Sequence, residues 1–130
     1  MPGFTESTET RAAPEEVWKL LYDPSRFPEW WADVATVEPG RDGGDFTVFS
    51  EGYPDFPIPQ QVETHQEDHS VRISCLVSDM RFEWRLEKLN GGTRISVEVE
   101  IPEQEAQRLD DQRDVARRSL GKLAELAGAG

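Results

Sequence analysis

The segment Thr10–Trp31, TRAAPEEVWKLLYDPSRFPEWW, constrains the fold most, because it places two short helices directly after a strand. Pro14 suits the first position of a helix, and the two glutamates after it complement the positive end of the helix dipole. Asp23-Pro24 ends this helix, because proline disfavours helical geometry in the residue before it, and Asp23 can cap a second short helix. The segment therefore predicts a helical turn of the chain between a first strand and the rest of the molecule.

The residues that follow read as strands until the last quarter of the chain. The polar, threonine-rich stretch Phe4–Arg11 is typical of an exposed edge strand. Further strands are expected at Val34–Glu38, Asp45–Glu51, Gln60–His65 and Val71–Ser78.

The last pair of strands has the clearest pattern. Apolar residues alternate with charged ones along one strand, and the same alternation returns after Asn90-Gly91-Gly92, a strong hairpin signal. The apolar positions are Met80, Phe82, Trp84 and Leu86, then Ile95, Val97, Val99 and Ile101. An antiparallel sheet with one buried and one solvated face explains both strands.

One long helix is expected from Pro102 to about Ala127. At 1.5 Å per residue it would reach roughly 38 Å, enough to cross a small sheet. Its apolar stripe, which Arg113 interrupts, comprises Ala106, Leu109, Ala116, Leu120, Leu123 and Ala127. Gly121 lies inside this helix, where glycine costs about 1 kcal/mol relative to alanine unless another group must approach closely. The order of elements predicts an α+β fold over residues 1–130, taken as a single domain.

Length and charge restrict the partners. A chain of 130 residues without a run of about 18 apolar residues offers no membrane insertion, and its N-terminus does not resemble a secretory signal. The single cysteine, Cys75, allows no internal disulfide, so we expect a cytoplasmic location. With 26 acidic and 14 basic residues, the net charge of −12 disfavours nucleic acid and anionic lipid surfaces. Monomer and homodimer both remain open.

The chain resembles the START-like superfamily, also called SRPBCC, the polyketide cyclase/dehydrase and lipid-transport family. The resemblance spans nearly the whole chain in the order of its elements, and it rests on Ala13-Pro14, Val17-Trp18, Leu21, Asp23-Pro24, Phe27, Trp30-Trp31 and Asn90-Gly91-Gly92-Thr93-Arg94. It implies a helix-grip fold, in which a curved seven-stranded antiparallel sheet wraps around the long C-terminal helix, with two short helices after the first strand. It also implies a cavity between sheet and helix that takes apolar molecules in many members of the family.

We expect the ligand site in that cavity, because small-molecule sites are usually concave and mostly apolar. The candidate lining residues are Trp30, Trp31, Tyr53, Phe56, Phe82, Trp84, Val97, Val99, Leu109, Arg113 and Ala116. The large apolar residues among them could equally be plain core, and the two neighbouring tryptophans could pack the short helices instead. Arg113 could bind a ligand carboxylate or enolate, or it could reach the surface or pair with an acid such as Asp110. The segment Gly52–Pro59, rich in proline and aromatic residues, could form a lid or close one end of the core.

The function expected from these features is the binding of a small hydrophobic molecule, lipid-, sterol- or polyketide-like. The alternatives are a polyketide cyclase or dehydratase and a partner-binding module without a ligand. No catalytic residue can be assigned, and no cofactor is expected. His65 and His69 flank two acidic residues, but in a strand and turn they share no face, so no metal site is expected. Cys75 is expected to be a buried filler without a nearby base.

Overall fold

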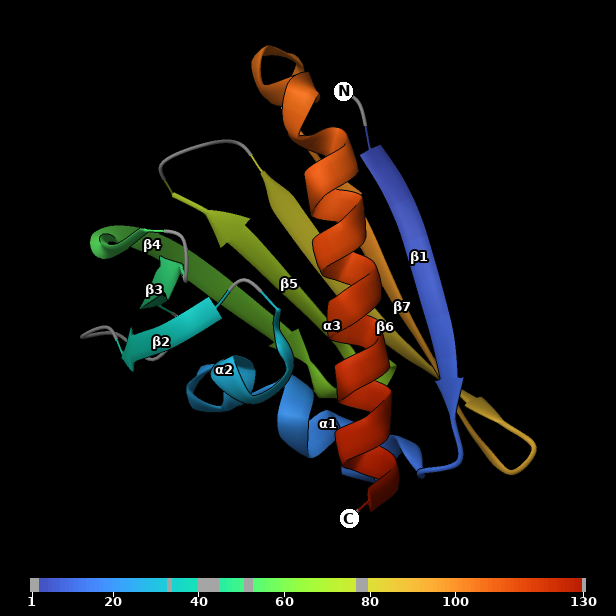
Figure 1. The fold of residues 1–130 in the computed structure, drawn as a ribbon. Coiled ribbons are helices and arrows are strands. Elements are labelled where there is room, and N and C mark those ends of the chain that lie inside the picture. The colour runs from blue at the N-terminus through green and yellow to red at the C-terminus, as the bar shows by residue number, and fades with distance from the viewer. Residues whose placement is uncertain (1–2, 33, 40–44, 51–52, 77–79, 130) are drawn as a thin grey trace.

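A computed structural model describes residues 3–32, 34–39, 45–50, 53–76 and 80–129 (Figure 1). The N-terminal part comprises β1 (Gly3–Thr10), α1 (Pro14–Leu21), the 3₁₀ helix η1 (Pro24–Arg26) and α2 (Phe27–Trp30). Five strands and a 3₁₀ turn follow: β2 (Val34–Pro39), β3 (Asp45–Ser50), β4 (Tyr53–His65), η2 (Gln66–Asp68), β5 (Ser70–Cys75), β6 (Arg81–Leu89) and β7 (Gly92–Glu100). The 3₁₀ helix η3 (Glu103–Arg108) and the long helix α3 (Leu109–Ala129) complete the chain.

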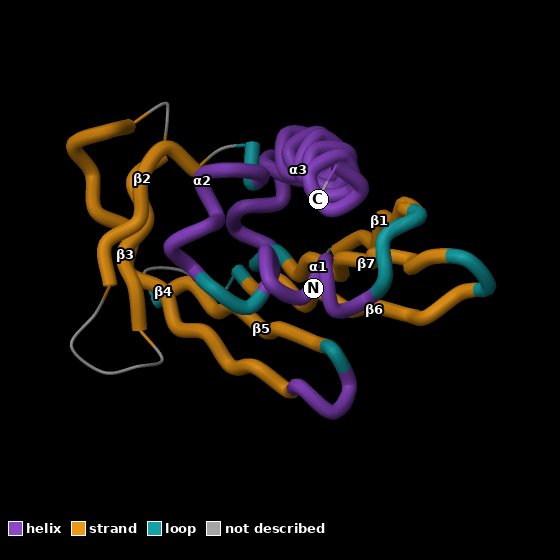
Figure 2. Tube along the Cα trace, turned by 90° about the horizontal axis from the view of Figure 1, so that it is seen from below, coloured by secondary structure: helices purple, strands orange, loops and turns teal. Residues whose placement is uncertain are grey.

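The strands form one antiparallel sheet in the order β1-β7-β6-β5-β4-β3-β2. Figure 2 shows the sheet as a bent layer from β2 to β1, with the helices on its concave side, and Figure 1 shows α3 running lengthwise beside β1. The chain bulges in β2 between Val34 and Thr36 and between Val48 and Ser50 in β3, which increases the local bend. The helix-grip fold that the resemblance implies is therefore confirmed.

The two short helices form where the sequence predicts them. Asp23 accepts a hydrogen bond from the backbone N–H of Ser25 at 3.0 Å and so caps η1. The indole Nε1 of Trp30 donates to the carbonyl oxygen of Leu20 at 2.9 Å, which ties α2 to the end of α1. This bond gives a fully buried indole its polar partner.

Two expectations about local structure need correction. The strand expected at Gln60–His65 begins earlier: the described residues of the segment that could form a lid belong to β4, which pairs with β3 and β5. The last helix is not α-helical from Pro102. It begins as 3₁₀ turns with non-helical backbone angles at Glu105 (φ −115°, ψ 18°) and becomes α-helical at Leu109. Pro102 has no side-chain acceptor that could cap an α-helical first turn, and only the N–H of Glu105 bonds to its carbonyl oxygen, at 2.9 Å.

The core lies between the concave face of the sheet and α3. The apolar positions predicted for the last hairpin are all buried there, including Met80 just before β6 and Ile101 just after β7. Two side-chain hydrogen bonds fix α3: the hydroxyl of Thr10 donates to the carbonyl oxygen of Ala124 at 3.2 Å, and the hydroxyl of Ser119 accepts from the N–H of Ala32 at 2.9 Å. The first bond attaches the C-terminal part of α3 to the end of β1, and the second attaches the middle of α3 to Ala32, two residues after α2. Among the described residues, no helix is both long and apolar enough to cross a bilayer.

The convex face of the sheet carries cross-strand ion pairs. Glu83 of β6 accepts hydrogen bonds from Arg85 (Nε–Oε1 2.8 Å) and from Arg72 of β5 (Nη2–Oε2 3.2 Å). Burial of its carboxylate raises the pKa of Glu83, but the hydrogen bonds and charges of the two arginines outweigh burial, so the pKa lies below its ordinary value.

Candidate functional site

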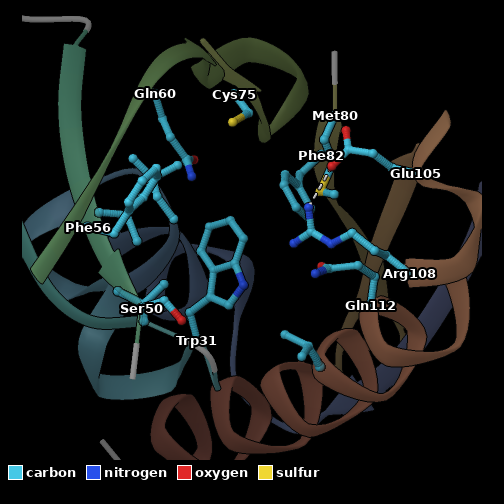
Figure 3. Close-up of a pocket in the computed structure, with 14 residues that line it drawn as sticks. Trp31, Ser50, Phe56, Gln60, Cys75, Met80, Phe82, Glu105, Arg108 and Gln112 are labelled. Carbon is cyan, nitrogen blue, oxygen red and sulfur yellow. Dashed lines mark hydrogen bonds and ion pairs between the residues drawn. The ribbon is translucent and has the colours of Figure 1, made fainter. Parts of the chain in front are cut away.

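A cavity of about 500 Å³ lies between the concave face of the sheet and the start of the C-terminal helical segment (Figure 3). Strands β2 to β5 and the beginning of β6 form one side, and η3 with the first turns of α3 forms the other. Its walls are mainly apolar and comprise Trp31, Val34, Val48, Ser50, Phe56, Ile58, Gln60, Cys75, Met80, Phe82, Glu105, Arg108, Gln112 and Val115. The cavity therefore occupies only one end of the space between sheet and helix, and the aromatic core fills the other.

Trp31 separates the core from the cavity. Its ring stacks on Trp30 (centroids 5.6 Å apart, planes 11° apart) and meets Phe82 edge-on (centroids 5.2 Å apart, planes 78° apart). Figure 3 shows its indole in the middle of the cavity wall, with the ring nitrogen toward Arg108 and Gln112. Contacts on both sides hold the ring, so it presents a fixed aromatic surface to the cavity.

Two carboxamides approach the cavity from opposite sides. Gln60 projects from β4 and is only 8% exposed; its Oε1 is shielded from solvent and has no hydrogen-bond partner among the described residues. Gln112 projects from α3 and is 9% exposed. Buried carboxamides normally find partners, so these two are the polar groups best placed to recognise a ligand.

A charged pair lies on the helical side of the cavity. Nη1 of Arg108 donates to Oε1 of Glu105 at 2.8 Å, and the side chains are 46% and 23% exposed respectively. Both belong to η3, whose departure from α-helical geometry at Glu105 brings them to the cavity (Figure 3). The guanidinium keeps further donors that Glu105 does not use, and these could bind an anionic or carbonyl group of a ligand.

Of the residues predicted to line the site, the structure brings Trp31, Phe56 and Phe82 together at the cavity. Phe56 is 61% exposed although it belongs to β4, so it lies at the cavity mouth. The side chain of Tyr53 lies outside the described part of the structure. Whether the three residues contact a ligand stays a prediction.

The other apolar candidates lie in the core instead of at the cavity wall: Trp30, Trp84, Val97, Val99 and Ala116 are buried, and Leu109 is partly buried against the same core. The physical reason is the elbow between α1 and β2. Trp30 contacts Trp84 edge-on at 5.0 Å between centroids, which fills the space beneath the middle of α3. Trp30 thus packs against the short helices, which was the second of the two interpretations of its role.

Arg113 faces β1, not the cavity. Its Nε lies 3.5 Å from Oε1 of Glu6, and its guanidinium carbon lies 5.2 Å from the centre of the Phe4 ring. Arg117 shares the same carboxylate oxygen at 3.1 Å. Arg113 therefore pairs with Glu6 and not with Asp110, the partner suggested by the sequence, because α3 packs along β1 and brings Glu6 across from Arg113.

Sequence reasoning missed most of the cavity wall. On β3 and β4, Val48, Ser50, Ile58 and Gln60 follow the two-residue period of a strand, and this signal was present in the sequence. Cys75, expected as a plain filler, is half-buried and lines the cavity. On the helical side the missed residues repeat at spacings of three and four: Glu105, Arg108, Gln112 and Val115. That stripe is mostly polar, so it reads as a solvated face unless the cavity beneath it is known.

Metal-ligating residues do not gather at this site. Within the described ranges, no group of three or more histidine, cysteine, aspartate or glutamate side chains is placed to hold an ion. His65 and His69 flank η2: Nε2 of His65 lies 3.9 Å from Oε2 of Glu63, whereas the ring of His69 packs edge-on against Trp18.

Comparisons with solved structures show the same fold at low sequence identity. XoxI from Bacillus cereus matches with a TM-score of 0.82 at 13% identity, over 96% of this chain and 94% of that one. The ZhuI aromatase/cyclase from Streptomyces sp. R1128 matches with a TM-score of 0.81 at 13% identity, over 97% and 93%. The di-domain ARO/CYC BexL of the BE-7585A biosynthetic pathway matches with a TM-score of 0.79 at 14% identity, over 96% of this chain and 46% of that one.

No curated protein matches this chain in sequence. The model of the family described as "Polyketide cyclase / dehydrase and lipid transport" matches residues 1–128, which is nearly the whole chain. Strand order, the gripped helix and this match agree, and the chain belongs to the polyketide cyclase/dehydrase and lipid-transport family.

Proposed function

We propose that the protein binds a small, largely apolar molecule in the cavity between the sheet and the η3–α3 segment. The observation that carries this proposal is the cavity of about 500 Å³ with mainly apolar walls. Its volume lies within the range of known small-molecule sites. The family description, which includes lipid transport, supports the same function.

Burial of apolar surface would supply the affinity. A ligand that buries about 300 Å² gains roughly 7 kcal/mol at 25 cal/mol per Å², before the cost of association. The fixed ring of Trp31 and the aliphatic side chains around it provide that surface without rearrangement. Because the cost of association reduces this gain, we expect a binding free energy of about −4 to −6 kcal/mol for simple apolar probes, which corresponds to dissociation constants from about 1 mM down to tens of micromolar.

The test combines a fluorescent probe with a variant that fills the cavity. The probe is 8-anilino-1-naphthalenesulfonate, titrated by fluorescence, and native mass spectrometry of the purified protein detects any retained apolar molecule. Val48→Trp places a large ring at the wall of the cavity, whereas Thr47→Trp places the same ring on the other face of β3. We expect Val48→Trp to weaken probe binding about tenfold or more and Thr47→Trp to leave it within about twofold.

The proposal fails if the wild-type protein binds neither this probe nor fatty acids, sterols or aromatic ketones, and carries no retained molecule. It also fails if both tryptophan variants bind the probe like the wild type, because binding would then occur outside the cavity. Circular dichroism of each variant shows whether it has folded.

A cyclase or dehydratase activity is the second candidate, and one observation favours it. The Glu105–Arg108 pair and the carboxamide of Gln112 all line the same cavity, so a proton donor or acceptor and a polarising cation lie next to the apolar walls. Incubation of the protein with a short linear poly-β-ketone, followed by mass analysis of products, tests it. Loss of water or ring closure faster than in buffer would support an enzyme, and unchanged recovery of the ketone would leave binding alone.

A further inference from the structure

We propose that Gln60 makes this cavity selective for an apolar ligand that carries an uncharged hydroxyl group. The inference rests on the proposed binding function and adds the chemistry of one end of the ligand. It starts from a single observation: the carboxamide of Gln60 points into an otherwise apolar part of the cavity, and its Oε1 is buried without a hydrogen-bond partner among the described residues (Figure 3).

An unpartnered buried carbonyl oxygen destabilises the protein, so its presence calls for a group that completes it. Gln60 is held in place because its backbone pairs with Phe46 of β3 on one side and Cys75 of β5 on the other. The side chain therefore cannot leave the cavity by a small movement of the strand. A terminal carboxamide rotates easily about its last torsion, so either its oxygen or its nitrogen can face the cavity.

A hydroxyl group fits this position best, because it donates and accepts. It can donate to the carboxamide oxygen or accept from the nitrogen, whichever faces the ligand. A charged group is disfavoured here. The cross-strand partners of Gln60 are Phe46 and Cys75, the next pair along the strands toward the cavity mouth is Val48 with Ile58, and none of these residues supplies a compensating charge. The nearest charged pair of the cavity, Glu105–Arg108, lies on the opposite, helical side (Figure 3).

The experiment compares three probes of nearly equal size by isothermal titration calorimetry at pH 7. They are 2-naphthol, which carries an uncharged hydroxyl group, 2-methylnaphthalene, which replaces it with a methyl group, and 2-naphthoate, which carries a negative charge. A site built to hydrogen-bond a hydroxyl group discriminates against the analogue that lacks it. We expect the wild type to bind 2-naphthol about five- to tenfold more tightly than 2-methylnaphthalene, as one net hydrogen bond allows.

Two variants on neighbouring positions of β4 assign the selectivity to Gln60. Gln60→Leu removes the carboxamide from the cavity, and Gln61→Leu makes the same change on the exposed face of the strand. We expect Gln60→Leu to reduce the naphthol preference to within twofold, mainly by weaker naphthol binding, and Gln61→Leu to retain it. Without ligand, Gln60→Leu should also raise the melting temperature by about 4 °C or more, since it removes an unsatisfied buried group.

The outcomes separate the two proposals. If the wild type binds 2-naphthol and 2-methylnaphthalene equally, or if Gln60→Leu keeps the preference, the inference about Gln60 is overturned while the binding function stands. A preference for 2-naphthoate over 2-naphthol that survives in Gln60→Leu also overturns it, because the helical side would then select the ligand. If no probe binds at all, both proposals fall together.

Discussion

Arg113 offers the sharpest test of how α3 is placed, because the sequence leaves open whether it binds a ligand or pairs with an acid, and the structure pairs it with an acid of β1. Its guanidinium approaches Glu6 and lies over the ring of Phe4, both on β1. Its Nε is buried but makes no hydrogen bond, so the interaction with Glu6 is an ion pair without directed bonding. Arg113→Ala should therefore loosen the contact between α3 and β1 and leave the cavity intact.

The magnitude follows from the exposure of the groups. The side chains of Arg113 and Glu6 are 39% and 21% exposed, and solvent-screened ion pairs contribute about 0.2–1 kcal/mol. Arg117 still binds Glu6 after the substitution, so the ion-pair part falls at the lower end. The cation–π contact adds about 0.5–1 kcal/mol at such a site. We expect a loss of about 1 kcal/mol in the free energy of unfolding, or about 4 °C in melting temperature for a chain of this length.

Urea unfolding followed by circular dichroism measures the loss, and the fluorescence titration measures probe affinity. Arg108→Ala is the matched comparison, because this arginine lines the cavity and its removal should weaken binding of the anionic probe about two- to fivefold. Arg113→Ala should leave probe affinity within about twofold. The placement of Arg113 would be refuted by unchanged stability together with a tenfold loss of affinity for the anionic probe.

Three other substitutions test local features of the fold. Gly121→Ala should stabilise the protein by about 1 kcal/mol in chemical unfolding, because its added Cβ meets no atom within 4 Å and alanine favours the helix; a loss of stability would contradict this. Gly92→Ala should destabilise the protein by about 3 kcal/mol or prevent folding, because its Cβ would fall on the carbonyl oxygen of Thr10; a melting temperature like the wild type's would show that the β1–β7 contact is looser. Glu83→Gln should cost stability at neutral pH but not in acid. Burial raises the pKa of Glu83, but the hydrogen bonds and charges of Arg85 and Arg72 outweigh burial and hold the pKa below its ordinary value. Its stabilisation is therefore fully present above the unfolded-state pKa of about 4.3 and is lost as the pH falls through the lower folded-state pKa. Unfolding curves of wild type and variant that stay separated by the same amount down to pH 2 would contradict that reasoning.

Local patterns of the sequence determined much of the architecture. The alternation in β6 and β7, the hairpin at Asn90–Gly92, the cap at Asp23 and the proline of α1 each act over a few residues, so they can be recognised without knowing the rest of the chain. The same holds for the apolar stripe that follows Arg113 in α3, whose residues Ala116, Leu120, Leu123 and Ala127 are buried as expected. These elements, in this order, predict an α+β fold, and the family resemblance adds that the sheet grips the last helix.

Which end of that space stays open was decided only by tertiary packing. Tryptophan is common in apolar ligand sites, so the sequence makes Trp30, Trp31 and Trp84 equal candidates. Contacts between α2 and β6 nevertheless place Trp30 and Trp84 in the core and only Trp31 at the cavity. The non-helical backbone at Glu105 and the long strand β4 likewise depend on neighbours distant in sequence. Arg108 therefore gave no local sign of facing a cavity, and the two-residue period of β4 showed only that Gln60 shares a face with Ile58. Burial is a property of what lies opposite a side chain, and a strand or helix pattern reports only which side chains share a face.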